Sequence, residues 1–365
     1  MAGADIANKT NYLSYNNSGA FSLQEYSNTE TVFVVVVMAV IFLIALAGNT
    51  LTIIVISRVP SLQTPTNLLI LNLSIADIFV ATFFVLFTTI DIYISQEWVF
   101  GTFLCKLVPF FQLTAARVSI LSLALISVER YFTMCKPKHR RFSLKKIKTF
   151  IALLWFIGMA SASPVLIVKK ITLRYGKHYC AETGWTFEEA KIYTTVNFVI
   201  MYLLPILTMS FTYINIGITV WRSSNATKSQ RAGHVKSTKQ KITKLSLVLV
   251  ISFVVSWAPV HFVSLNIFWG TLIHNLPKNT TYLLFPIFTG LAASNCALNP
   301  ILYALMSINF RRALADFLNQ VCSNSCSARR TFKKMTYRDQ QGKCLINIGT
   351  SAVPLQQLAS FVSSV

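Results

Sequence analysis

Glu129-Arg130-Tyr131 and Asn299-Pro300-Ile301-Leu302-Tyr303 close the third and the seventh of seven long apolar segments in this sequence. A charged pair at a helix end, and a polar stretch broken by proline within a helix, are costly in contact with lipid. Both stretches are therefore expected where protein groups, rather than lipid, satisfy their polar atoms.

The composition places the chain in a membrane. Of its 365 residues, 54% are hydrophobic and only 12% are charged, and the mean hydropathy is +0.56. A soluble core of this size could not bury so much apolar surface. A bilayer core about 30 Å thick requires about 20 apolar residues per helix. Seven stretches reach that length: Val32–Ile56, Thr66–Ile90, Phe103–Tyr131, Thr149–Val168, Ile192–Trp221, Ile242–Trp269 and Tyr282–Met306. The start of the fifth is the least sharply defined, because Glu188, Glu189 and Lys191 lie there.

The basic residues predict the orientation of the chain. Lys and Arg favour the cytoplasmic side in short loops. The loops Met134–Lys148 and Arg222–Lys244 hold seven basic residues each and no acid, so both are expected to face the cytosol. With seven crossings, the N-terminus is then outside and the C-terminus inside, in a multi-pass protein of the plasma membrane. This topology accounts for the net charge of +21 without a nucleic-acid partner.

The predicted topology divides the chain into four parts. Residues 1–31 form an extracellular tail, and residues 32–306 form an all-α bundle of seven transmembrane helices. Residues 307–320 place Phe310, Leu314 and Phe317 on one side, with basic residues beside them. This pattern is typical of an amphipathic helix that lies on the inner membrane lipid. Residues 321–365 follow as a cytoplasmic tail, and no cleavable signal peptide is expected because no apolar run precedes Val32.

The same topology sorts the modification sites. Extracellular sequons for glycosylation lie at Asn8, Asn16 and Asn279. Cys105 and Cys180 are the two cysteines in an oxidising location, so we expect them to form a disulfide. Cys322 and Cys326 follow the amphipathic helix and are candidates for S-palmitoylation.

One set of motifs falls on each predicted helix. In order they are Gly48-Asn49; Leu73 and Asp77; Cys105 with Glu129-Arg130-Tyr131; Trp155 and Pro164; Pro205 and Tyr213; Phe253 with Trp257-Ala258-Pro259; and Asn295 with Asn299-Pro300-Ile301-Leu302-Tyr303. Any one match is weak, whereas the ordered set is specific. From Gly48 to Phe317 the chain resembles the rhodopsin-like, or class A, G protein-coupled receptors. The resemblance implies an extracellular ligand and a heterotrimeric G protein as partners.

The resemblance implies an activation switch at the cytoplasmic end. Arg130 beside Glu129 is a charge held by a neighbouring acid. The pair is bistable, because Arg130 can release Glu129 and contact a protein that enters from the cytosol. In the family, Tyr213 and Tyr303 swing in to hold the open state. The structural alternative is an interfacial Arg130 that reaches lipid phosphates.

Pro259 predicts a hinge in the sixth segment. It removes a backbone hydrogen bond two residues after Trp257 and kinks the helix beneath the expected outer cavity. Trp257, with Ile120, Pro205 and Phe253 below it, resembles the family's transmission core. Ordinary aromatic packing is the alternative.

Asp77 lies in mid-membrane, where a carboxylate requires partners or a cation. By resemblance its neighbours are Ser119, Asn295 and Asn299, which coordinate a sodium ion in many class A receptors. Oxygen donors suit a hard cation. Ala115 stands where many of those receptors carry Asn, so a purely structural hydrogen-bonded cluster is the alternative. No other cofactor is expected.

The residues expected around the outer cavity favour a peptide ligand. Amine receptors of this class place Asp where this chain has Gln112, and opsins require a lysine in the seventh segment, where Tyr282–Met306 has none. Gln112 resembles several neuropeptide receptors, and an amide both donates to and accepts from a peptide backbone or a C-terminal amide. Matching positions add Asn197, Trp257, His261 and Phe268 to the predicted pocket.

Acids at the outer rim indicate the charge of that peptide. The second outer loop, Lys169–Glu182, alternates apolar and polar residues around a glycine, which is the pattern of a β-hairpin. Glu182 in this loop, and Asp91 and Glu97 near the end of segment two, suit a ligand with Arg or Lys, such as an Arg-Phe-amide type peptide. Basic residues of the same loop make the field mixed.

Arg117 lies near the bilayer midplane, twelve residues after Cys105 and thirteen before Arg130. No acid in segments four to seven can neutralise it. Two interpretations stay open. Arg117 either contacts a carbonyl or acid of the ligand deep in the pocket, or is held by helix carbonyls and Asn197.

Other function classes fit less well. A lipid or other small-molecule ligand is the alternative within the receptor class. A seven-helix pump or transporter would need a chain of acids, a cofactor lysine or internal repeats, and Asp77 is the only acid deep in a helix. An enzyme is not expected, because the sequence contains no recognisable nucleophile, metal-ligand set or nucleotide loop.

The inner face leaves the type of G protein open. Lys138 stands where many relatives carry an apolar residue that enters the G protein. Serines and threonines between Ser323 and Ser364 suit phosphorylation and arrestin binding. The final Ser363-Ser364-Val365 is similar to a PDZ ligand.

Overall fold

The computed structural model describes residues 28–136, 142–174, 176–226, 230–270, 278–306, 310–317, 336–338, 344–348 and 351–354. The predicted glycosylation sites Asn8 and Asn16, both palmitoylation candidates and the PDZ-like end lie outside these residues. The chain divides into two compact units, Met1–Ile308 and Asn309–Val365. In the second unit, residues 310–317 are helical, within the predicted range of 307–320. A small antiparallel sheet of β3 (Thr336–Arg338), β4 (Cys344–Ile348) and β5 (Ser351–Pro354) follows.

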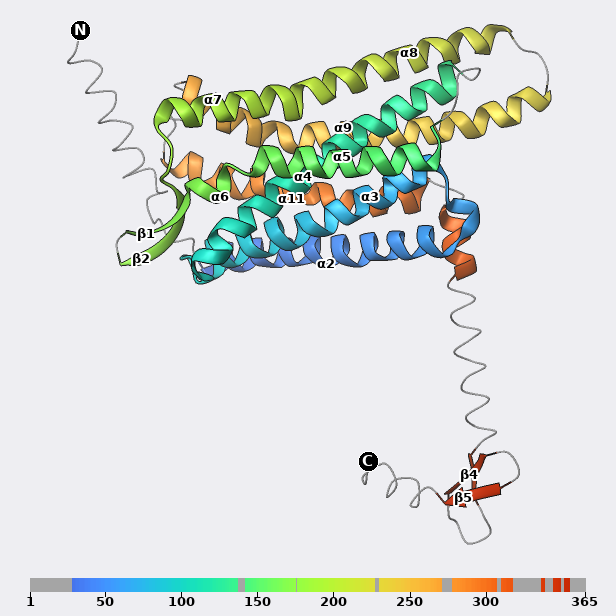
Figure 1. Ribbon diagram of the computed structural model, residues 1–365, viewed down its shortest axis with the longest axis horizontal. Coiled ribbons are helices and arrows are strands. Elements are labelled where there is room, and N and C mark those ends of the chain that lie inside the picture. The colour runs from blue at the N-terminus through green and yellow to red at the C-terminus, as the bar shows by residue number, and fades with distance from the viewer. Residues whose placement is uncertain are drawn as a thin grey trace. The chain divides into compact units, whose positions relative to one another are not determined.

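Seven helical segments of the described residues in the first unit are long and apolar enough to cross a membrane (Figure 1). They are α2 (Asn28–Arg58); α3 (Pro65–Val80) continued by η2 (Ala81–Leu86) and η3 (Thr89–Ile94); α4 (Gly101–Cys135); α5 (Leu144–Ala162) with α6 (Val165–Val168); α7 (Phe187–Phe198), η4 (Val199–Leu203) and α8 (Leu204–Ala226); α9 (Gln230–Trp269); and α11 (Lys278–Met306). The short η1 (Pro60–Leu62) joins α2 to α3. The predicted all-α bundle is confirmed.

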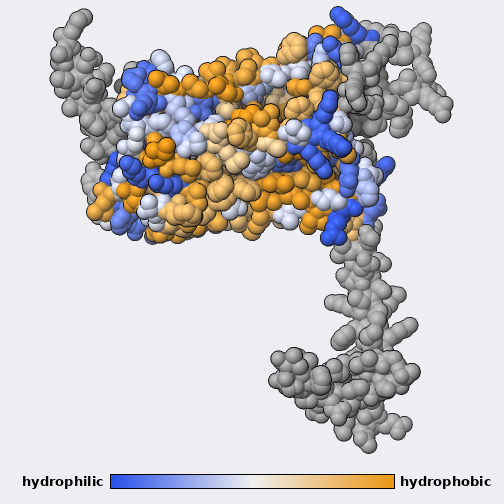
Figure 2. Space-filling model, viewed as in Figure 1, coloured by the Kyte–Doolittle hydropathy of each residue, from blue (hydrophilic) through white to orange (hydrophobic). Residues whose placement is uncertain are grey.

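The surface of the bundle suits lipid around its middle. Figure 2 shows hydrophobic residues over the central part of the bundle and hydrophilic residues gathered at both of its ends. Large apolar side chains face outward, such as Phe156 in α5 and Phe211 in α8, which are 66% and 63% exposed. Such a belt would be unfavourable in water and is favourable in hydrocarbon. The chain is a multi-pass membrane protein.

All seven crossings begin earlier than hydropathy predicts, and the fifth and the sixth show why. The fifth crossing starts at Phe187 rather than Ile192, because Thr186 and Glu189 form a capping box. The Thr186 hydroxyl accepts from the Glu189 amide at 3.3 Å, and the Glu189 carboxylate accepts from the Thr186 amide at 2.7 Å. Glu189, one of the charged residues that made this start unclear in the sequence, is therefore part of the signal that begins the helix. Likewise α9 begins at Gln230, well before Ile242, because apolarity marks the membrane core and not the end of the helix.

Amide side chains tie the buried faces of the helices together. Asn49 of α2 donates to the carbonyl oxygen of Cys296 in α11 at 2.9 Å. Asn72 of α3 donates to the Ser122 hydroxyl of α4 at 2.9 Å and accepts from the indole nitrogen of Trp155 in α5 at 2.9 Å. Buried hydrogen bonds of this kind fix the neighbouring helices where no water competes for the polar groups.

The loop between the fourth and the fifth crossing is the predicted hairpin. Strands β1 (Lys169–Arg174) and β2 (Lys177–Glu182) pair antiparallel, with Lys169 opposite Glu182 and Ile171 opposite Cys180. Gly176 adopts a φ of 76° in the turn, a conformation that glycine adopts without steric cost. The sequence pattern of alternating apolar and polar residues is thus confirmed as a β-hairpin.

Candidate functional site

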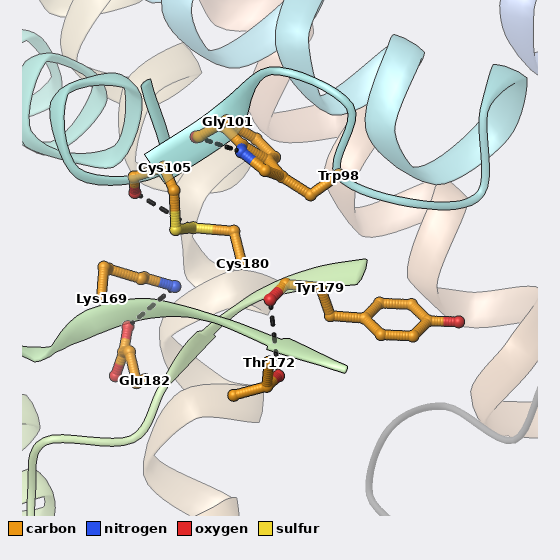
Figure 3. Close-up of a disulfide and its surroundings, with 8 residues drawn as sticks. All are labelled: Trp98, Gly101, Cys105, Lys169, Thr172, Tyr179, Cys180 and Glu182. Atoms are coloured by element: carbon orange, nitrogen blue, oxygen red, sulfur yellow. Dashed lines mark hydrogen bonds and ion pairs between the residues drawn. A yellow bond between two sulfur atoms is a disulfide. The ribbon is translucent and has the colours of Figure 1, made fainter. Parts of the chain in front are cut away.

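The hairpin is anchored near the N-terminal end of α4 (Figure 3). Cys180 of β2 forms the predicted disulfide with Cys105, and their Cα atoms are 5.5 Å apart. Beside it the Trp98 amide donates to the His178 carbonyl at 2.8 Å, and the Trp98 indole donates to the Gly101 carbonyl at 2.9 Å. Trp98 and Cys105 are buried in one apolar cluster. One end of the bundle therefore carries a fixed two-stranded rim.

The rim carries acids whose surroundings differ. Glu182 is paired with Lys169 across the hairpin at 3.3 Å (Figure 3). The Glu97 carboxylate accepts from the His178 amide at 3.4 Å, and Asp91 is partly exposed in η3. Burial raises the pKa of the Tyr179 phenol, and the negative charges of Glu97 and Asp91 raise it further. Asp91 and Glu97 therefore act together at this point of the rim, whereas Glu182 is already paired, and Lys170, Arg174 and Lys177 of the hairpin keep the overall field mixed.

Arg117 bridges three helices below this rim. Its guanidinium Nη2 donates to Asn197 Oδ1 at 2.8 Å and to the Tyr193 hydroxyl at 3.1 Å, both in α7. Tyr193 in turn donates to the Ser161 carbonyl of α5 at 3.0 Å. The two acceptors of Arg117 are thus an amide and a phenol.

Aromatic rings connect α7 and η4 to the predicted hinge of α9. The ring of His261 lies 4.2 Å from that of Tyr202, and 6.5 Å from that of Trp257. Trp257 lies 6.0 Å from Phe253, which is buried. The Tyr202 hydroxyl donates to the Val254 carbonyl at 2.8 Å. Because Pro259 lies within the same helix, these contacts surround the point at which α9 lacks a backbone hydrogen bond.

Two further predicted pocket residues, Phe268 and Gln112, lie on α9 and α4. Phe268, near the end of α9, packs against Phe187 with ring centroids 5.5 Å apart. Gln112 is partly exposed on α4, between the disulfide and Arg117. The structure thus joins Arg117 to Asn197, and His261 to Trp257, while Asp91 and Glu182 belong to the rim.

Asp77 lies in a buried polar cluster near the middle of the bundle. Its carboxylate is 1% exposed and accepts from Asn299 Nδ2 at 2.6 Å, with the Ser119 hydroxyl at 3.5 Å. Asn299 Oδ1 and Asn295 Nδ2 have no hydrogen-bond partner among the described residues. The predicted neighbours Ser119 and Asn299 therefore contact Asp77 directly, whereas no direct hydrogen bond joins Asn295 to it in the described part of the chain.

The opposite end of the bundle holds a charged lock. Arg130 Nε lies 3.5 Å from Glu129 Oε2. The same Glu129 accepts from the Thr66 hydroxyl of α3 at 2.8 Å and from the Thr133 hydroxyl at 3.0 Å. Glu129 is therefore held by Arg130 and by two threonine hydroxyls. Of the predicted partners of the open state, Tyr213 of α8 already interacts electrostatically with Arg130, and Tyr303 is buried in α11.

A family model described as "7 transmembrane receptor (rhodopsin family)" matches residues 48–303. The chain belongs to this family. The predicted resemblance to class A receptors is thereby confirmed, and the relatives below bear out the neuropeptide type.

Several relatives of this receptor are peptide receptors by name. It is 32% identical over 290 residues to a QRFP-like peptide receptor of Branchiostoma floridae, which covers 76% of this chain and 75% of the relative. It is 29% identical to the pyroglutamylated RF-amide peptide receptor of Mus musculus, over 80% of this chain and 70% of the relative. The galanin receptor 2b of Danio rerio is 32% identical, over 81% of this chain and 77% of the relative.

Some residues of the receptor's site could not be found from the motifs. Thr66 lies far from Glu129 in sequence, so only the packing of α3 on α4 brings it there. Thr133 was within reach, because it lies four residues after Glu129 on the same helix face. Tyr193 stands in the same relation to Asn197, four residues earlier, and could have been included with it.

Proposed function

We propose that this receptor binds an extracellular peptide, amidated and with a basic residue near its C-terminus, and that the bound state activates a heterotrimeric G protein. The observation that carries the proposal is the similarity to the QRFP-like and pyroglutamylated RF-amide peptide receptors, whose names specify peptide ligands and, in the second case, an amide. The family is one of receptors, and no enzymatic activity is proposed.

The rim supports the positive charge assigned to the peptide. Asp91 and Glu97 lie at the same end of the bundle as the hairpin, and their charges act together on Tyr179. An Arg of the ligand gains from such a field most of all in its rate of association. Gln112, which both donates and accepts, is the group that we assign to the peptide's backbone or terminal amide.

Activation is proposed to be a population shift of the bundle. A peptide that binds better to the state with an open cytoplasmic end favours that state by its differential affinity, and the G protein favours it reciprocally. The contact from His261 to Trp257 links the ligand region to the helix that carries Pro259. On the inner side, Glu129 is held by two threonine hydroxyls besides Arg130, so we assign to Arg130 the part that leaves the pair and contacts the G protein.

A second-messenger screen tests this function. Cells that express the receptor are exposed to amidated peptides ending in Arg-Phe-amide, to amines and to lipids, while calcium and cAMP are recorded. We expect a response to the amidated peptides, with a potency about tenfold lower in Asp91→Asn, since one charged interaction is lost. Glu188→Gln is the matched control, because Glu188 is an exposed acid paired with Lys191 on α7. A response to lipids or amines alone would refute the peptide ligand.

The cluster at Asp77 supports a second proposal, a sodium ion in the inactive state. Asp77 and Ser119 supply oxygen donors, and the unpartnered Asn299 Oδ1 is an acceptor that a hard cation would satisfy. Bound sodium would hold Asp77 charged within the bundle. We expect sodium to lower the affinity of the activating peptide, because it binds the inactive state.

The sodium proposal is checked by peptide binding in sodium chloride and in choline chloride. In Asp77→Asn the difference between the two salts should vanish, since the charged ligand of the cation is gone. An equal sodium effect in wild type and Asp77→Asn would assign the effect to another site.

The remaining partners are proposed from topology. The N-terminus faces outside and the C-terminus the cytosol of a plasma-membrane receptor, because the basic loops are cytoplasmic by the positive-inside rule. Asn8, Asn16 and Asn279 are then glycosylated, and Cys322 and Cys326 palmitoylated. The tail binds arrestin when phosphorylated, and its end binds a PDZ domain.

A further inference from the structure

Arg117 is a buried cation without a matching acid. Its residue is 6% exposed, in the middle of the α4 span. The ion pairs found among the described residues are Arg130 with Glu129, Lys169 with Glu182 and Lys191 with Glu188. Arg117 takes part in none of them. A charge at this depth is costly unless other groups compensate it.

The neighbours of Arg117 are held as neutral acceptors. Asn197 Nδ2 donates to the Tyr193 carbonyl at 2.8 Å, which turns its Oδ1 toward Arg117. The Tyr193 hydroxyl donates a hydrogen bond to the Ser161 carbonyl and accepts one from Arg117. Both contacts use Nη2 of the guanidinium. Among the described residues, the positive charge of Arg117 is therefore compensated by neutral hydrogen-bond acceptors and not by an anion.

The second terminal nitrogen of the guanidinium is left over. Arg117 Nη1 is buried and has no hydrogen-bond partner among the described residues. Every guanidinium nitrogen is a hydrogen-bond donor and none can accept. A buried donor that makes no hydrogen bond is unfavourable. Nη1 carries two hydrogens and part of the positive charge, so it suits an oxygen acceptor such as a carboxylate or an amide carbonyl.

The position of this donor connects it with the conformational switch. Asn197 is followed by Phe198, whose ring lies 5.8 Å from that of His261. His261 in turn lies 6.5 Å from Trp257. A group that binds to Arg117 therefore bears on the same turn of α7 that contacts α9.

We propose that Arg117, positioned by Tyr193 and Asn197, binds a planar oxygen acceptor of the ligand at Nη1, either a carboxylate or an amide carbonyl at the end of the peptide that enters farthest. The inference rests on the proposed peptide function and assigns the deepest contact of that ligand. Gln112, on the outer side of Arg117 along α4, then contacts the part of the peptide that follows.

Two small probes test the site without any peptide. The purified receptor is heated in rising sodium benzoate or in benzamide, at constant sodium. We expect one of them to raise the Tm by about 2–4 °C when it approaches tenfold its Kd. Benzoate would identify a carboxylate site and benzamide a carbonyl site. Lys170→Gln, which removes an exposed basic residue of the hairpin, should keep the shift, and Arg117→Gln should lose it.

The conservative variant Arg117→Lys distinguishes loss of the binding group from misfolding. It retains the positive charge but not the planar guanidinium, so its Tm shift should be smaller than that of wild type and larger than that of Arg117→Gln. Equal shifts in wild type and Arg117→Gln, or no shift with either probe, would overturn the site.

A peptide pair then joins the site to the function. One peptide ends in Arg-Phe-amide and its twin ends in the free acid. Whichever peptide is more potent on wild type should lose about tenfold to a hundredfold in potency on Arg117→Gln, because a charge-assisted hydrogen bond is lost. Unchanged potency would overturn the ligand contact. If neither peptide activates wild type, the peptide function fails by itself, while the benzoate and benzamide shifts still decide the site.

Discussion

Arg130→Ala is expected to abolish signalling by the activating peptide while leaving the receptor at the cell surface. Arg130 is the member of the lock that can leave Glu129 and contact the G protein, so its removal deletes the contact of the active state. Glu129 keeps its hydrogen bonds from Thr66 at 2.8 Å and from Thr133 at 3.0 Å. Two hydroxyl donors still satisfy the Glu129 oxygens after its counter-ion is removed, so the inactive bundle should survive the substitution.

This prediction is checked by calcium and cAMP responses beside surface staining and peptide binding. Arg130→Lys is the matched control, because it keeps a cation but not the planar fork and should signal partially. Glu129→Gln weakens the inactive lock and should raise basal signalling. Full signalling by Arg130→Ala would show that Arg130 only reaches lipid phosphates.

Replacement of Cys105 and Cys180 by alanine is expected to remove most of the receptor from the cell surface. The disulfide spans 75 residues of sequence, and loss of a native disulfide costs about 2–5 kcal/mol. The hairpin would then be held mainly by the hydrogen bond between the Trp98 amide and the His178 carbonyl at 2.8 Å. The affinity for the peptide should fall by about tenfold or more, since the acids of the rim would no longer be held in position.

The disulfide prediction is measured by surface staining and peptide binding of the double alanine variant. Cys135→Ser serves as the control. Cys135 is a free thiol that contacts Thr219 and Asn215, and a hydroxyl can take over both contacts. A double alanine variant that binds the peptide as wild type does would contradict the role assigned to the hairpin.

The fold was largely predictable because two of its signals are local. Each crossing needs a long apolar run, so hydropathy located all seven, and strict alternation over Lys169–Glu182 located the hairpin. Helix starts were harder, since the helix continues beyond the lipid core. The polar residues that follow Phe187 and Gln230 therefore belong to the helices, by capping in the first case. The π-helical segments η2 and η3 contain no proline, whereas η4 precedes Pro205, which cannot donate to a carbonyl of η4.

The site was predictable where its chemistry sits on one helix or in a fixed motif. The contact of Arg117 with Asn197 was among the predicted alternatives, and Asp77 lies with Ser119 and Asn299. Pairings between distant elements were not predictable. The register that sets Glu182 opposite Lys169 reduces the charge that Glu182 offers to a ligand, and only the hairpin geometry determines that register.

Nucleotide exchange tests the central proposal most directly. The purified receptor in lipid nanodiscs is mixed with each of a panel of heterotrimeric G proteins, with and without a peptide ending in Arg-Phe-amide. We expect the peptide to accelerate exchange on at least one G protein with wild type and not with Arg130→Ala. Equal exchange with and without the peptide, across the whole panel, would contradict the account of a peptide-activated receptor.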